Sequence, residues 1–186
     1  MQRIPTLTVD FPSWARISPK RQEHVRRVAA LSMMWAEEMG VSGEERDRWL
    51  NAVALHDALK SAPKEVLLEL APDSWGVDAL RHGPAAAVKA ELDGEEDRGV
   101  LDAVRYHSIG YADWEPVGQI LYLADFLEPG MSFHSREHES LILQVTTDLE
   151  GVLRAVAIER VTGTVALGKA LLQETVEFWN SLVRTS

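Results

Sequence analysis

The stretch VALHDALK, residues 53–60, places an imidazole and a carboxylate side by side, at His56 and Asp57, inside an apolar segment. Burying either group is costly unless a partner satisfies it. Trp49 and Val53 precede His56 at helical spacing, so we expect His56 on the buried face of a helix. Asp57 could cap a neighbouring helix or pair with an arginine, but a metal ion would satisfy both side chains at once.

Four more polar residues would also be costly to bury without a partner. His24 lies at the edge of an apolar helical stripe, His82 precedes a Gly-Pro pair, and His107 lies near an expected helix end. Asp125 interrupts the apolar run ILYLADFL, residues 120–127, where an unpaired carboxylate would be strongly destabilising. Taken singly, each residue has an ordinary explanation, such as a turn residue or a cation that favours a helix C-terminus.

A divalent ion would explain the burial of all six residues together. Nitrogen and oxygen ligands of this kind suit iron, manganese, zinc or nickel rather than calcium. The chain has no cysteine, which excludes a thiolate metal site and a thiol nucleophile. It also lacks the Gly-x-Ser-x-Gly, Walker A and Rossmann glycine motifs.

Two further histidines, His134 and His138, are spaced i, i+4 in a polar segment. The residues around them do not make the His-Glu-x-x-His pattern of zinc peptidases. We therefore predict that both are solvated surface residues.

The elements that must position these side chains are helices, because no stretch sustains the alternation of a strand. Residues 1–17 contain two prolines and no sustained period, so we expect an irregular N-terminal arm. Helices are predicted from Pro19 to about Gly40, from 43 until Pro63, over 64–70, 83–92, 96–108 and 116–127, and in two or three segments up to about 183. We predict a single all-α domain over 18–186, with its metal-binding core at 20–130 and C-terminal helices at 135–184.

The formal net charge is −10, which argues against a nucleic-acid polymer as partner. An anionic substrate would need local cations or metal ions to offset the repulsion. The N-terminus has no signal-peptide pattern, and no apolar run reaches about 18 residues. Together with the absence of cysteine, these features predict a cytoplasmic protein without a membrane span.

The ordered set of histidines and aspartates resembles the HD-domain superfamily of metal-dependent phosphohydrolases. Within it, the similarity is to the YqeK-type symmetrical bis(5'-nucleosyl)-tetraphosphatases. The matching stretches are LHDALK (55–60), RHGP (81–84), AVRYHS (103–108), LYLADFLEP (121–129) and ETVEFWN (174–180). Together they extend over most of residues 20–180.

The resemblance implies an HD-fold helical bundle with two divalent transition-metal ions, iron most often, with manganese, zinc, nickel or magnesium as alternatives. The implied ligands are His24, His56, Asp57 and Asp125 for one ion, and His82 and His107 for the second, with Asp57 bridging. It further implies that Asp57 and Lys60 are catalytic and that Lys60, Gly83 and Ser108 contact the substrate. His82 and His107 are alternatives for assisting the leaving group.

The implied activity is metal-assisted hydrolysis of a phosphate ester or anhydride in a nucleotide, namely symmetrical hydrolysis of diadenosine tetraphosphate to ADP. Three positions depart from the family: Tyr111, Gln119 and Met131 stand where basic residues are usual. Fewer cations favour a smaller phosphate ester, so a phosphatase for a small nucleoside phosphate is one alternative. A non-catalytic nucleotide-binding module is another, and whether the chain forms a homodimer stays open.

Overall fold

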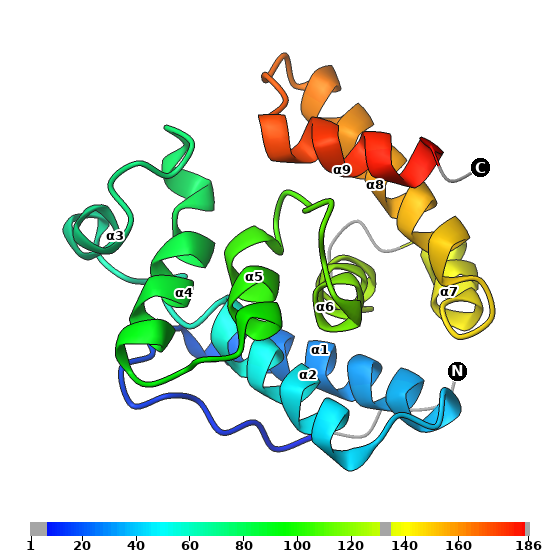
Figure 1. The fold of residues 1–186 in the computed structure, drawn as a ribbon, viewed down its shortest axis with the longest axis horizontal. Helices are drawn as coiled ribbons and strands as arrows, with labels where there is room; N and C mark the ends of the chain where they lie inside the picture. The colour runs from blue at the N-terminus through cyan, green and yellow to red at the C-terminus, as the bar shows by residue number, and fades with distance from the viewer. Residues whose placement is uncertain (1–6, 131–134, 185–186) are drawn as a thin grey trace.

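The computed structural model describes residues 7–130 and 135–184, and every regular element within them is a helix. In chain order (Figure 1) these are α1 (Pro19–Glu38), α2 (Gly43–His56), α3 (Lys64–Leu70), the 3-10 turn η1 (Asp78–Leu80), α4 (His82–Leu92), α5 (Arg98–Tyr106), α6 (Pro116–Leu127), α7 (Arg136–Gln144), α8 (Leu149–Ala166) and α9 (Gln173–Arg184). The prediction of an all-α fold is confirmed.

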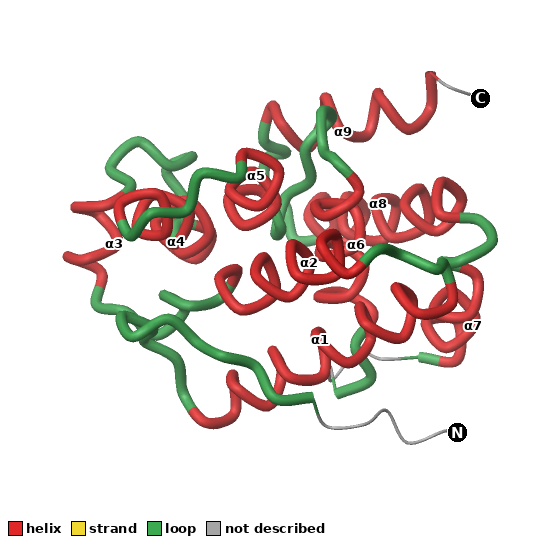
Figure 2. The backbone as a smooth tube through the Cα atoms, turned by 60° about the horizontal axis from the view of Figure 1, so that its bottom comes forward, coloured by secondary structure: helices red, strands yellow, loops and turns green. Residues whose placement is uncertain are grey.

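Helices α1 and α2 lie side by side along one edge of the molecule (Figures 1 and 2), α6 packs against both of them, and α5 packs against α2 and α6. Helix α4 packs against α5 and α2, and α3 lies outside α4. At the other side α8 packs against α6 and carries α9 along its length, while α7 contacts α6 and α8. The C-terminal helices therefore cover the face of α6 that α1 and α2 leave open.

An aromatic cluster ties the last helix to the rest of the core. The Phe178 ring of α9 lies 5.4 Å from the Trp114 ring and 5.3 Å from the Tyr122 ring, between centroids. Gly110, at φ +90°, lies directly against Phe178, and a Cβ there would collide with the ring. Glycine is needed here both for the left-handed backbone and for the close approach.

The first helix starts as predicted, but the second ends earlier. Ser18 caps α1, because its hydroxyl accepts a hydrogen bond from the Arg21 amide. Helix α2 ends at His56 rather than running to Pro63. The chain then turns because the N-terminal arm binds it: the Arg16 amide donates to the Ala58 carbonyl, and the Ser61 amide donates to the Arg16 carbonyl.

This early end matters because several helix ends meet at one place. His56 is the last residue of α2, His82 is the first of α4, and His107 follows the last residue of α5. Asp125 lies in the last turn of α6.

None of the helices in residues 7–130 and 135–184 combines the length and apolar character that a bilayer span requires.

Arg48 of α2 joins three helices by bonding to the residues that begin α5 and α6. It donates to both oxygens of Asp97, at 2.6 and 2.9 Å, and to Glu115 at 2.6 Å. Asp97 also caps α5 by accepting a hydrogen bond from the Val100 amide. The hydrogen bonds from Arg48 lower the pKa of Asp97 below its ordinary value, although burial raises it.

We expect Arg48→Met to lower the free energy of unfolding at pH 7 by about 1–2 kcal/mol. Because the pKa of Asp97 is depressed in the folded protein, its ion pair stabilises the fold above the unfolded pKa of about 3.9. That contribution is lost as the pH falls through the lower, folded-state pKa. Urea unfolding of both proteins across this range should show the difference narrowing below about pH 4. A difference that stays constant down to acid pH would contradict this role.

Candidate metal centre

The structure brings the six predicted ligands together at the meeting point of the helix ends, around Asp57. Asp57 Oδ2 lies 3.6 Å from His56 Nε2 and 3.8 Å from His24 Nε2. Asp57 Oδ1 lies 3.1 Å from His82 Nε2 and 3.8 Å from His107 Nε2. One carboxylate oxygen therefore faces each pair of histidines. The four imidazoles and Asp57 are all buried.

Three of the four imidazoles are oriented by the backbone of their own chain segment. Each Nδ1 donates to the carbonyl three residues earlier: His56 to Val53 at 2.7 Å, His82 to Ala79 at 3.0 Å and His107 to Val104 at 2.8 Å. A carbonyl oxygen only accepts, so Nδ1 carries the hydrogen and the lone pair is on Nε2. All three Nε2 atoms therefore present lone pairs to Asp57, which is the orientation of metal-binding histidines.

His24 is oriented by Glu128, a residue that no sequence pattern singled out. His24 Nδ1 donates to Glu128 Oε1 at 2.9 Å, while Nε2 faces Asp125 Oδ1 at 3.1 Å. Glu128 is fully buried, and Arg27 donates to both of its oxygens. Burial raises the pKa of Glu128, but the hydrogen bonds from His24 and Arg27 outweigh it and lower the pKa to about 2. The carboxylate is therefore ionised at neutral pH.

The electrostatics differ between the two sides of Asp57. Burial raises the pKa of Asp57, but the positive charge around it, including that of Lys60, outweighs this effect and holds the pKa well below its ordinary value. Burial lowers the pKa of His107 well below 6.5, and the neighbouring His82 and His56 lower it further. Burial also lowers the pKa of His24, yet Asp125 and Glu128 raise it to about 9 overall. The carboxylates of Asp125 and Glu128 therefore lie on the His24 side of Asp57, whereas the His107 imidazole on the other side is neutral.

Unsatisfied acceptors provide the test of whether these residues suit metal ions. Among the described residues, His56 Nε2 and both Asp57 oxygens accept no hydrogen bond of normal geometry. His82 Nε2 and His107 Nε2 lie only 3.2 Å apart, although both atoms are acceptors. A bound cation would satisfy buried acceptors that face one another. Two groups, His24-His56-Asp57 and Asp57-His82-His107, each bring their ligand atoms within 4.8 Å of one another. This donor set fits divalent metal ions.

Three cations surround the cluster. Arg21 Nη1 lies 2.9 Å from Asp57 Oδ2, and Lys60 Nζ donates to His82 Nε2 at 3.0 Å. Arg160 of α8 donates to Asp125 Oδ2 and to the Ser108 carbonyl, both at 3.1 Å. No sequence pattern singles out Arg160, because its position depends on how α8 packs against α6.

The remaining predicted substrate contacts adjoin the cluster. The Ser108 hydroxyl donates to His107 Nε2 at 3.0 Å. Gly83 is buried where α4 crosses α5, and a Cβ there would lie 3.0 Å from two carbonyl oxygens of α5. Close helix packing is thus one reason for glycine at this position. Substrate contact by Ser108 and Gly83 stays a prediction.

The three positions that lack the usual basic residue differ in surroundings. The Tyr111 ring stacks on Tyr106, with centroids 4.3 Å apart and planes 11° apart. Gln119 is half-buried on α6. Met131 lies outside the described residues.

The prediction that His138 is a solvated surface residue is wrong. His138 is buried in the first turn of α7, where it forms a capping box with Ser135. Its Nε2 lies 2.9 Å from a carboxylate oxygen of Glu159 on α8. The polar sequence around His138 gave no sign that α8 covers it. His134 lies outside the described residues.

Comparison with known proteins shows to which family the chain belongs. The chain is 31% identical over 108 residues to a "Bis(5'-nucleosyl)-tetraphosphatase, symmetrical" from Halalkalibacterium halodurans, covering 57% of this chain and 56% of the relative. A protein of the same name from Bacillus subtilis is 28% identical over 127 residues, covering 63% and 66%. The match thus spans between about half and two thirds of these curated relatives.

A solved structure from Clostridium acetobutylicum, described as a predicted HD superfamily hydrolase involved in NAD metabolism, has the same fold. It covers 91% of this chain and 92% of its own, with a TM-score of 0.79 and 23% identity. The model of the HD domain family matches residues 21–130, which is more than half of the chain. Family and donor set together indicate divalent-metal binding. The resemblance seen in the order of histidines and aspartates is confirmed, and the chain belongs to the HD domain family.

Proposed function

We propose that this protein is a metal-dependent phosphohydrolase that acts on nucleotides and hydrolyses dinucleoside tetraphosphates symmetrically. The observation that carries the proposal is the sharing of Asp57 between two groups of buried nitrogen and oxygen ligands. Paired divalent sites of this kind are used for phosphoryl transfer to water. The choice of substrate is supported by the names of the curated relatives.

The ligand assignment is part of the proposal. We propose His24, His56, Asp57 and Asp125 as ligands of one ion, with His82, His107 and the shared Asp57 as ligands of the second. Iron is the first candidate, and manganese, zinc, nickel and magnesium are alternatives. Such ions, when bound, would polarise the phosphoryl group and activate the attacking water.

The side chains around the ligands have tasks of their own. The Lys60 side chain is about one-third exposed and its ammonium lies 3.6 Å from Asp57 Oδ1, so it can reach a phosphoryl oxygen of a substrate bound at the cluster. Charge on the phosphoryl oxygens is what the protein must offset in such transfers. Asp57 accepts hydrogen bonds only, since its lowered pKa keeps it ionised, and it can therefore orient the attacking water. Arg160 fixes Asp125, and Glu128 fixes His24.

A panel of nucleotides tests the substrate. With manganese or anaerobic ferrous iron present, we expect diadenosine tetraphosphate and one water to give two ADP and no orthophosphate, because the bond between the two inner phosphoryl groups breaks. Chromatography of the products over time measures this. Release of ATP with AMP, or of orthophosphate from the tetraphosphate, would contradict symmetrical cleavage.

A second candidate function is hydrolysis of a smaller nucleoside phosphate. The stacking of Tyr111 on Tyr106 favours it, because an uncharged aromatic pair stands where a cation would bind a longer phosphate chain. Faster turnover of AMP or of another nucleoside monophosphate than of the tetraphosphate, in the same panel, would select this function. Nucleotide binding without turnover of any panel member would indicate a non-catalytic module.

A further inference from the structure

An acidic protein that binds a polyphosphate must concentrate positive charge near the binding site, and one face of α1 carries three cationic side chains. We propose that a cleft along α1 binds the part of the phosphate chain that extends beyond the metal centre. This α1 cleft has a volume of about 310 Å³ and is lined by Lys20, Arg21, His24, Arg27, Glu128 and Gly130, together with Ser18. The inference rests on the proposed function in taking a nucleotide as the substrate.

The α1 cleft is continuous with the candidate metal centre because His24 belongs to both. Lys20, Arg21 and Arg27 lie four before, three before and three after His24 on α1. Residues three and four apart share one face of a helix, so the cations project on the side of the metal ligand. A phosphate chain held at His24 would therefore extend along these residues.

The three cations are held differently. Arg21 is 30% exposed while its Nη1 contacts Asp57, so its guanidinium lies between the cluster and the cleft. Arg27 is fixed by its two hydrogen bonds to Glu128, and a Cβ at Gly130 would collide with its guanidinium. Lys20 is exposed and has no ion-pair partner among residues 7–130 and 135–184, so its ammonium is available to a ligand.

The charge of the cleft is positive overall. Three cationic side chains line it, and Glu128 is the one carboxylate among its described lining residues. The start of α1 adds to this charge, because its first turn contains no acidic residue and Ser18 caps it. The positive end of a helix favours phosphate in such a position.

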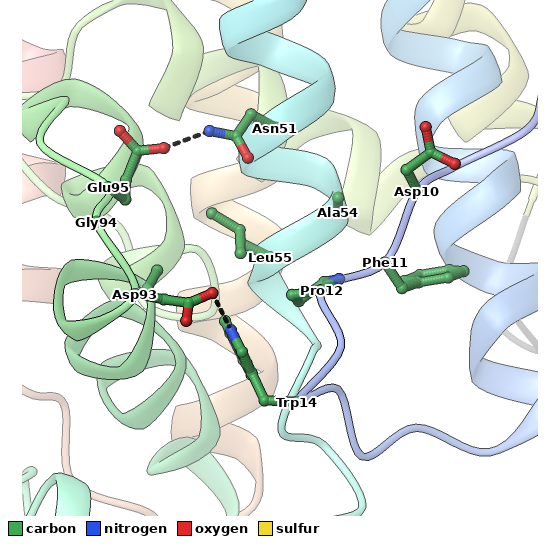
Figure 3. Close-up of a pocket in the computed structure, with 11 residues that line it drawn as sticks. Asp10, Phe11, Pro12, Trp14, Asn51, Ala54, Leu55, Asp93, Gly94 and Glu95 are labelled. Atoms are coloured by element: carbon green, nitrogen blue, oxygen red, sulfur yellow. Dashed lines mark hydrogen bonds between the residues drawn. The ribbon is translucent and has the colours of Figure 1, made fainter.

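A larger pocket elsewhere carries acidic rather than basic side chains around it (Figure 3). Its volume is about 350 Å³, and the carboxylates of Asp10, Asp93 and Glu95 project around it. One of these, Asp93, accepts a hydrogen bond from the Trp14 ring. Carboxylates repel a polyphosphate, so size alone does not identify the phosphate-binding cleft.

Binding of two adenine nucleotides that differ only in phosphate number tests the proposal. The metal-loaded protein is titrated calorimetrically with AMP and with adenosine 5'-(β,γ-imido)triphosphate, which resists cleavage between its outer phosphates. We expect the triphosphate analogue to bind at least about tenfold more tightly than AMP. Lys20→Met, at an exposed position, should reduce that ratio by about fivefold or more.

Arg26→Met is the matched control. Arg26 lies on the same helix and its loss changes the net charge equally, but it lies against Gln22 and Phe11 rather than lining the cleft. The control should change the ratio by less than about twofold. Equal effects of Lys20→Met and Arg26→Met, or no preference for the triphosphate in the unaltered protein, would overturn the proposal. Because binding is measured apart from turnover, an inactive protein that keeps the Lys20-dependent ratio would contradict only the proposed function.

Discussion

Replacing Asp57 with alanine is expected to remove bound metal and hydrolytic activity together. Asp57 is the one residue that belongs to both ligand groups, so its loss affects both proposed ions. We expect the rate to fall at least about a thousandfold, which corresponds to about 4 kcal/mol of activation free energy. Metal content by mass spectrometry and turnover of the same samples measure the two effects.

A second substitution separates this effect from misfolding. Asp57 lies among four histidines, Arg21 and Lys60, and its removal leaves the charges of Arg21 and Lys60 without this carboxylate. Asp57→Asn keeps the volume and packing of the side chain but removes its charge, and it should lose metal and activity in a folded protein. Asp47→Ala, at an exposed acid of α2, the helix that ends just before Asp57, is the control and should keep both. Full activity in a metal-free Asp57→Asn protein would contradict the account.

Glu128→Gln is expected to weaken metal binding by about 10–100-fold, the usual cost of losing the partner that orients a ligand histidine. The Glu128 carboxylate accepts the Nδ1 hydrogen of His24 and so keeps Nε2 turned toward Asp57 and Asp125, where a metal ion would displace its proton. A glutamine amide can turn its NH2 group toward His24 and loses the ion pair with Arg27. Competition with a chelator of known affinity measures the change.

Excess metal should restore most of the Glu128→Gln rate, because Glu128 does not itself contact the proposed ions. Glu45→Gln is the control, since Glu45 also pairs with a partly buried arginine, Arg48, but lies away from the cluster. It should keep the affinity of the unaltered protein. Equal metal affinity in Glu128→Gln and the unaltered protein would show that His24 does not need this partner.

The sequence predicted the helices well where local signals determine them. The predicted helix starts at Pro19 and at residue 43 match α1 and α2, which Ser18 and Ser42 cap, and the predicted helix over 116–127 matches α6. The premature end of α2 was not predictable from local spacing, because it depends on backbone hydrogen bonds with the distant Arg16.

The residues of the candidate site also include some that the sequence predicts and some that depend on distant packing. Its histidines and aspartates were predictable because polar residues in apolar helical stretches need a partner, and because their order matches a family. Glu128 and Arg160 were missed because each looks like an ordinary surface charge in the sequence. Their positions follow from the packing of α1 and α8 against α6. A second acid three residues after Asp125 was the one available signal for Glu128.

The metal content of anaerobically purified protein tests the central claim most directly. Two groups of ligands that share Asp57 predict about two transition-metal ions per chain. Mass spectrometry of the purified protein, with the Asp57→Asn variant measured beside it, should find these ions in the unaltered protein and not in the variant. A protein that hydrolyses nucleotides at full rate while it contains no metal would contradict the account.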